Sequence, residues 1–196
     1  MHVRNSNTVF IPNNVAIIGA FDKKYLNSAD GTMTMAKNYL DFFELNTNFS
    51  RGYLKDNAEE RKTGYQDRIT GIDKGYKSSL IMVSFQNNTS AAAGKDASII
   101  LLEEAGIFPN LQEVYSITQP TLEDGDVITG MMVIFGTGGT KGANWETLEK
   151  MFYNPTAYNA VTFNNVWDEN QSGYGCGFFH SYLQNLKPYV DDAGNS

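Results

Sequence analysis

Two adjacent glutamates, Glu103 and Glu104, follow directly after the apolar segment Ile99–Leu102. A buried strand that ends in this way places carboxylates at the carboxyl edge of a sheet, where open α/β sheets bind ligands. One carboxylate there can hold Mg²⁺ through water, because Mg²⁺ prefers oxygen ligands and keeps several waters. The next carboxylate can orient a water for attack on a phosphate. The alternative is a strand capped by two solvated acids, and the motif alone does not decide between them.

A second strand-like segment, residues 130–135, ends in the sequence Gly136-Thr137-Gly138-Gly139-Thr140. A small polar residue at the end of a neighbouring strand can place a hydroxyl or a backbone N–H near a bound phosphate and transmit its loss to a moving subdomain. Alternatively, this sequence is an ordinary glycine-rich turn with no role in phosphate binding. A third possibility is that the loop Gly136–Gly142 holds an anion with backbone N–H groups and hydrolyses nothing.

Continuous apolar segments recur along the chain, with helical or polar segments between them. Strands are expected at residues 15–20, 79–85, 97–103 and 130–135, with a weaker candidate at 160–163. Helices are expected at 32–45, 111–117 and 144–153, and the first should bury Met33, Ala36, Tyr39, Leu40 and Phe43. Continuous apolarity predicts strands covered on both faces, and therefore an α/β fold with a mostly parallel sheet flanked by helices.

Two segments lack this pattern. Residues 46–77 are polar and predict a helical insertion or a mobile loop. Residues 55–77 are the most basic stretch of the chain, but acids dilute the charge, so a solvated surface is favoured over contact with DNA. Residues 164–196 are rich in Asn, Gly, Asp and aromatic residues and predict an irregular segment.

Composition narrows the classes of protein that the chain can belong to. It has 196 residues, of which 41% are hydrophobic, and a net charge of −7, so it can fold but lacks the basic excess of a general nucleic-acid-binding protein. The single cysteine, Cys176, excludes an internal disulfide and suits a reducing cytoplasm. The apolar segments are too short to span a bilayer, so no membrane partner is expected.

In order and separation, the two motifs resemble the large terminase subunit of tailed bacteriophages, the ATPase motor that packages DNA into a capsid. Ser98–Gly106 is similar to the Walker B segment of that family, and Phe135–Gly138 is similar to its coupling motif. Ala91–Lys95 is similar to the segment that precedes Walker B. Cys176–Phe179 and Val190–Asn195 look like the stretch that leads out of the ATPase region.

The resemblance covers residues 79–196, whereas residues 1–78 match by general pattern only. It implies a RecA-like P-loop NTPase fold of the ASCE type, with residues 79–142 as the core of a partial ATPase domain that extends over residues 1–196. The implied function is the coupling of ATP hydrolysis to the movement of double-stranded DNA into a procapsid. The implied cofactors are ATP and Mg²⁺.

The resemblance also implies roles for individual residues. Glu103 would serve Mg²⁺ through water, and Glu104 would be the catalytic carboxylate. The coupling residues would be Gly136, Thr137 and Gly138. Lys95 would be a basic finger that reaches the nucleotide of a neighbouring subunit. Family members more often carry Asp at the first acidic position and Arg at the finger, whose planar fork suits phosphate better.

The implied partners are double-stranded DNA, the portal protein, the small terminase subunit and other copies of the chain in a ring. The implied location is the host cytoplasm and, transiently, the portal of the procapsid. No GxxxxGK[ST] phosphate loop occurs in the chain, and the nearest segment, Gly71–Ser78, has the wrong spacing. We therefore expect Walker A to precede Met1, a nuclease domain to follow Ser196, and ATP turnover by this chain alone to be slow or absent. A purely structural phage protein is the remaining alternative.

Overall fold

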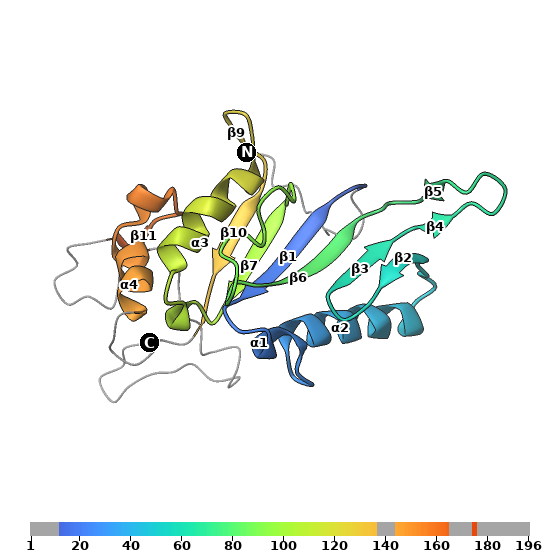
Figure 1. The fold of residues 1–196 in the computed structure, drawn as a ribbon, viewed down its shortest axis with the longest axis horizontal. Coiled ribbons are helices and arrows are strands. Elements are labelled where there is room, and N and C mark those ends of the chain that lie inside the picture. The colour runs from blue at the N-terminus through green and yellow to red at the C-terminus, as the bar shows by residue number, and fades with distance from the viewer. Residues whose placement is uncertain (1–11, 137–143, 165–173, 176–196) are drawn as a thin grey trace. The chain divides into compact units, whose positions relative to one another are not determined.

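The computed structural model describes residues 12–136, 144–164 and 174–175, and the chain divides into two compact units, residues 1–145 and 146–196. The first unit is built on a six-stranded sheet in the order β10-β7-β1-β6-β3-β2 (Figure 1). Its strands are β1 (Val15–Ala20), β2 (Tyr53–Asp56), β3 (Glu60–Thr63), β6 (Ser79–Ser84), β7 (Ile99–Glu103) and β10 (Met131–Ile134).

Four of the six strands are parallel. β1 pairs in parallel with both β6 and β7, and β7 pairs in parallel with β10. β3 is antiparallel to β6 and to β2. This confirms the expected α/β fold with a mostly parallel sheet flanked by helices, and the register places Ala20 of β1 beside Glu103 of β7.

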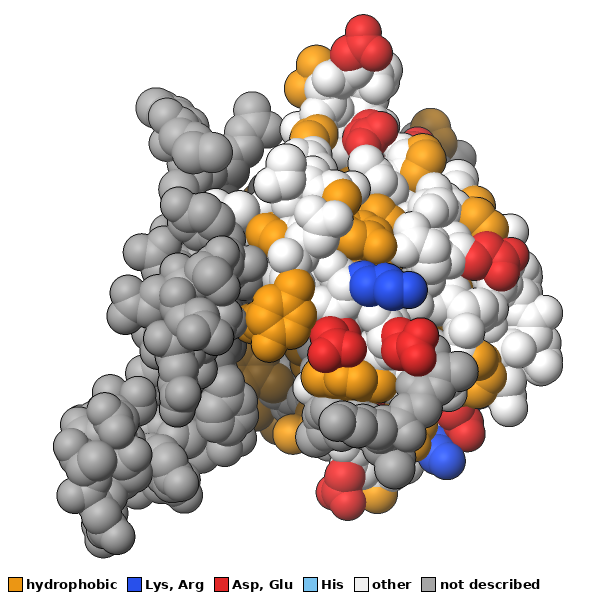
Figure 2. Space-filling model, turned by 90° about the vertical axis from the view of Figure 1, so that its left-hand side faces the viewer, with side chains coloured by type: hydrophobic (Ala, Val, Ile, Leu, Met, Phe, Trp, Pro, Cys, Tyr) orange, Lys and Arg blue, Asp and Glu red, His pale blue; other side chains and the backbone are white. Residues whose placement is uncertain are grey.

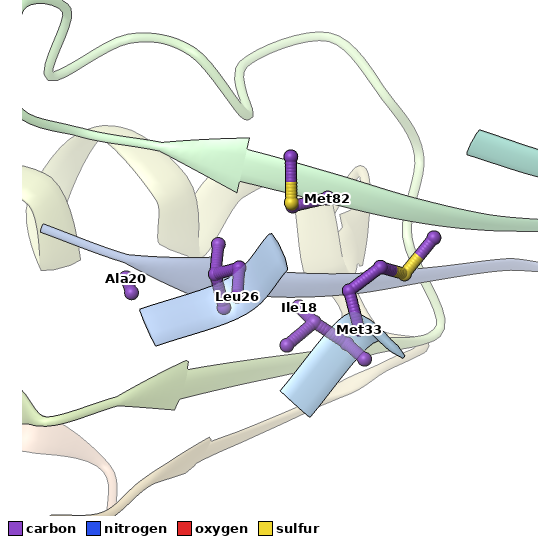
Figure 3. Close-up of a cluster of buried hydrophobic side chains, with 5 residues drawn as sticks. All are labelled: Ile18, Ala20, Leu26, Met33 and Met82. Carbon is purple, nitrogen blue, oxygen red and sulfur yellow. The ribbon is translucent and has the colours of Figure 1, made fainter. Parts of the chain in front are cut away.

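Helices cover the sheet on both sides. α1 (Lys24–Asn27) and α2 (Thr32–Asn46) follow β1 and pack on one face, where Ile18, Ala20 and Met82 meet Leu26 and Met33 (Figure 3). α3 (Leu111–Thr118) follows β7 and lies on the other side of the sheet (Figure 1). The chain moves from β1 to β6 in one direction and from β7 to β10 in the other, so right-handed crossovers place the two sets of helices on opposite faces.

Shorter elements complete the described residues. In the first unit these are η1 (Ala105–Ile107), η2 (Gln119–Leu122) and the ribbon β8 (Glu123–Asp124) with β9 (Val127–Ile128). The second unit holds most of α4 (Trp145–Tyr153), η3 (Pro155–Tyr158), β11 (Phe163–Asn164) and β12 (Tyr174–Gly175). The strand expected at residues 160–163 is wrong except at Phe163, which pairs with β12 in a two-stranded ribbon. No helix in the described ranges is long and apolar enough to cross a bilayer.

Two expectations about burial are wrong. Of the face expected to be buried on α2, Met33 is buried, whereas Tyr39 is 68% exposed. β10 was expected to be covered on both faces, but Met131 is 56% exposed. The two departures have separate causes. α2 packs on the sheet through Met33, near its start, and β10 is an edge strand of the described sheet.

Residues 46–77 were expected to be a helical insertion or a mobile loop. They do form an insertion between α2 and β6, but it is built of strands, so the helical form is wrong. β2 and β3 form a hairpin that extends the main sheet, and β4 (Tyr65–Gln66) and β5 (Asp73–Lys74) form a ribbon that projects from it (Figure 1). The β2–β3 hairpin buries Arg61, which forms ion pairs with Asp41 of α2 and Asp56 of β2. Apolar periodicity cannot reveal a strand whose buried side chain is a paired arginine.

We call the projecting ribbon, residues 64–77, the arm. At its tip the Asp67 carboxylate accepts hydrogen bonds from the backbone N–H groups of Ile69 and Thr70, both at 3.0 Å, and forms an ion pair with Lys74. The Lys74 ammonium, followed by these two N–H groups, lowers the pKa of Asp67 to about 2. The turn is therefore stabilised by the charged form of Asp67.

The ion pair at the tip makes the order of the arm depend on pH. Because the pKa of folded Asp67 lies below that of an unfolded aspartate, its contribution is present above about pH 4 and is lost as the pH falls toward 2. Lys74→Met should raise the pKa of Asp67 toward its ordinary value, as measured by NMR titration of the Ile69 and Thr70 amides. Lys77→Met is the control, and an unchanged midpoint in the Lys74 variant would contradict the assignment.

Candidate functional site

The carboxyl edge of the sheet between β1 and β7 is a topological switch point. The chain leaves β1 toward the face covered by α2, and it leaves β7 toward the face covered by α3. In open α/β sheets, the crevice between two such strands is the usual place for a ligand. Glu103 at the end of β7, Glu104 directly after it and Thr32 at the start of α2 lie at this edge.

Glu103 is held at the first turn of α2. The Thr32 hydroxyl donates a hydrogen bond to Oε2 of the half-buried Glu103 carboxylate. The backbone N–H groups at the start of a helix carry partial positive charge, which favours a carboxylate at this place. Sequence reasoning missed Thr32, because nothing in the sequence shows that β1 pairs with β7. The available signal was the Gly31-Thr32 start of a helix after a buried strand.

Glu104 lies where the chain turns sharply. Its φ of 53° and ψ of 44° are left-handed, a conformation that costs energy for a residue with a side chain. The Leu102 carbonyl accepts a hydrogen bond from the N–H of Phe135, and the Phe135 carbonyl accepts one from the N–H of Ala105, both at 3.0 Å. The ladder between β7 and β10 thus continues past the ends of the strands and surrounds Glu104.

Gly136 packs directly against this turn. A Cβ atom at Gly136 would lie 2.7 Å from the Cα atom of Glu104 and 2.8 Å from the backbone nitrogen of Ala105, and its φ is +152°. The structure therefore brings the acidic strand end and the start of the predicted coupling motif into backbone contact. Thr137 and Gly138 lie outside the described residues, as does the loop Gly136–Gly142 beyond its first residue, so their roles stay predictions.

Lys95 occupies a different environment. It is half-buried in the loop before β7 and lines a polar cavity of about 300 Å³. The charged side chains around this cavity are Lys23, Lys55, Glu59, Glu60 and Lys95, among which Lys23 pairs with Glu59 and Lys55 with Glu60. Neither Glu103 nor Glu104 lines this cavity, so the structure does not join Lys95 to the acidic strand end. A role in a neighbouring subunit stays a prediction.

The acidic strand end offers a small set of oxygen ligands. Within the described ranges, no group of three or more His, Cys, Asp or Glu side chains is placed to hold a metal ion. Glu103 and Thr32 instead supply one carboxylate and one hydroxyl. This set fits Mg²⁺, which usually binds one or two protein oxygens and keeps its remaining waters, and it does not fit Zn²⁺.

Fold and site together define an α/β protein with an acidic pair at a switch point of its sheet. No family model matches the chain, and no curated protein is found to match it. Among solved structures it is similar to the ATPase domain of the large terminase of Thermus phage P74-26, in a form with one arginine mutated to alanine, at 18% identity and a TM-score of 0.48. The match covers 69% of this chain and 52% of that one, so the chain spans about half the length of that structure.

The contact between Gly136 and Glu104 predicts a cost for any side chain at position 136. Gly136→Ala should lower the free energy of unfolding by about 2–3 kcal/mol, because a methyl group adds a clash with backbone to an unfavourable φ. Gly94→Ala is the matched control, since Gly94 also has a positive φ but nothing lies within 4 Å of an added Cβ. Equal losses in urea unfolding of the two variants would contradict the close approach.

The hydrogen bond between Thr32 and Glu103 can be isolated in a double-mutant cycle. Thr32→Val should cost about 1–2 kcal/mol, because it leaves a half-buried carboxylate without its hydroxyl donor. In a Glu103→Ala background the same change should cost much less. Additive effects in urea unfolding would show that the two side chains do not interact.

Proposed function

We propose that this chain is part of a DNA-packaging ATPase of the large-terminase type, and that it carries the acidic residues of the hydrolytic site. The observation that carries the proposal is the position of Glu103 and Glu104 at the β1–β7 switch point, with the backbone of Gly136 packed on Glu104. The order of the motifs along the chain adds to it. The support comes from the chain's own residues and not from the similarity to the terminase structure.

In this proposal the two carboxylates have separate tasks. Glu103, oriented by Thr32, would hold a water of a bound Mg²⁺ ion, and the ion would supply positive charge beside the phosphates of ATP. Glu104 would orient the attacking water and accept its proton as the water oxygen bonds to the γ-phosphorus, while the bond from that phosphorus to the β–γ bridging oxygen breaks and ADP leaves. The left-handed backbone of Glu104 separates its side chain from the strand that fixes Glu103, so that the two acids can serve different oxygen atoms.

The same geometry suggests how hydrolysis is coupled to movement. Gly136 lies against the Cα atom of Glu104 and leaves no space between the two backbones. A rotation of Glu104 on loss of the γ-phosphate would therefore displace Gly136 and, through it, Thr137 and Gly138. We propose that this segment transmits the loss of phosphate to the rest of a motor.

The partners of such a motor follow from the proposal. They are double-stranded DNA, the portal protein, the small terminase subunit and other copies of this chain, in the host cytoplasm and at the procapsid portal. Contact with DNA requires a local basic surface, because the net charge is −7. On the face shown in Figure 2, the described basic side chains have acidic and hydrophobic neighbours, so that face is a poor candidate.

The site can be tested with Mn²⁺ in place of Mg²⁺, because Mn²⁺ broadens NMR signals of nearby nuclei. Addition of Mn²⁺ with ATP should broaden the amides of Thr32, Glu104 and Gly136 first, and Glu103→Ala should abolish this pattern. Asp126→Asn, an exposed acid in the β8–β9 turn, is the control. Broadening that is centred elsewhere, or that survives in Glu103→Ala, would refute the site.

The role of Glu104 needs a separate test. Turnover by this chain should be slow or absent, since no phosphate loop grips the β- and γ-phosphates. Any turnover that is observed should fall at least about 100-fold in Glu104→Gln, because the attacking water loses its base. Hydrolysis that persists in this variant would show that Glu104 is not the catalytic carboxylate.

A further inference from the structure

The arm presents apolar side chains to solvent on an ordered turn. Ile69 at the tip is 97% exposed, and Ile72, Tyr65 and Tyr76 are also exposed. The turn is fixed by hydrogen bonds from Ile69, Thr70 and Gly71 to Asp67, in addition to the ion pair with Lys74. An exposed isoleucine on an ordered turn, with two exposed tyrosines elsewhere on the same arm, has the composition of a protein-binding surface.

The same chain contains an apolar cavity of a size that can receive such a side chain. It has a volume of about 260 Å³ and lies between α2 and the exposed part of the sheet face. Its apolar lining comes from β1, β6, β7 and α2, and includes Ala16, Ile18, Leu80, Leu101, Ala36 and Leu40. Thr63 and Ser78, the residues on either side of the arm, line this cavity. The arm itself projects away from α2 and the main sheet (Figure 1), so its tip does not fill the cavity of its own copy.

One wall of the cavity is polar. Arg51 and Arg61 both line it with side chains that are 7% exposed, and Nε of Arg61 has no hydrogen-bond partner within the described part of the chain. Although burial lowers the pKa of Arg61, its hydrogen bonds to Asp41 and Asp56 raise it above the ordinary value, so the guanidinium stays charged. A peptide carbonyl beside the inserted side chain would satisfy Nε without adding a charge.

Charge favours contact between an arm and the rest of another copy. Arg68, Lys74 and Lys77 outnumber Asp67 and Asp73, so the arm has a net charge of +1. The remaining residues have a net charge of −8, so the whole chain has a net charge of −7. Because each copy has a net negative charge, two copies repel each other overall. The positively charged arm is the segment that the negative charge of a second copy attracts.

We propose that the arm of one copy inserts Ile69 into the cavity beside α2 of a second copy. The two surfaces differ, so the contact is head-to-tail and can close into a ring or continue as an open chain. The inference extends the self-assembly within the proposed function by naming its surfaces. It can be tested without nucleotide or DNA, so its failure and the failure of the ATPase assignment are distinguishable.

Sedimentation velocity over a range of concentrations tests the contact. The wild-type chain should self-associate, and Ile69→Asp should weaken the association at least about 10-fold, because a charge replaces the buried side chain. Ile72→Asp should weaken it less. Val127→Asp in the β8–β9 ribbon is the matched control, since Val127 is an exposed aliphatic residue on another ribbon and should have no effect.

A mixing experiment tests whether the contact is head-to-tail. Ala36→Phe should fill the cavity and block self-association while the arm stays intact; thermal unfolding checks that each variant folds. Ile69→Asp retains a cavity and Ala36→Phe retains an arm, so a mixture of the two should form a one-to-one heterodimer. A wild-type chain that stays monomeric, or a mixture that stays monomeric, would overturn the proposal.

A contact with DNA would give a different result. If Ile69→Asp and Ile72→Asp leave self-association unchanged but weaken binding of a fluorescent DNA duplex, the arm contacts DNA and the proposal is wrong. If both variants weaken self-association alone, the second copy is the partner.

Discussion

The parallel pairing of β1 with β7 is the constraint on which the rest of this structure depends. The register places the end of β1 beside Glu103, and the helix that follows β1 then begins next to that carboxylate. Because the chain continues from the two strands to opposite faces, no helix of the described residues crosses the edge between them. One backbone ladder therefore places the Glu103 carboxylate at the switch point and brings it to the Thr32 hydroxyl that orients it.

A second constraint acts at the end of β10. The N–H of Phe135 donates a hydrogen bond to the Leu102 carbonyl, and the N–H of Ala105 donates one to the Phe135 carbonyl. These bonds bring Gly136 against Glu104. The turn at Glu104 is thus held by the backbone of Phe135 and Gly136 on one side and by strand β7, which precedes it. A residue in a strained conformation needs such surroundings to keep its geometry. The two sequence motifs depend on each other for their structure, whatever chemistry they perform.

Sequence patterns predicted the central strands and the helices well, because both bury apolar side chains at a regular spacing. They also placed the acidic pair at a strand end. They could not predict the bond between Thr32 and Glu103, because strand order is not a local property. They failed at residues 46–77, where Arg61 occupies a buried strand position through ion pairs rather than through apolar character. They overestimated the burial of Met131 and Tyr39, since a run of apolar residues does not show whether another element packs over all of them.

Arg61 gives α2 a mechanical property. Near its start the helix is bonded to the Glu103 carboxylate through Thr32, and farther along it is bonded to the β2–β3 hairpin through Asp41 and Arg61. With 15 residues it forms a stiff rod of roughly 22 Å. A small tilt imposed at Thr32 would therefore become a larger displacement at the outer strands, so that α2 acts as a lever between the acidic strand end and the far edge of the sheet.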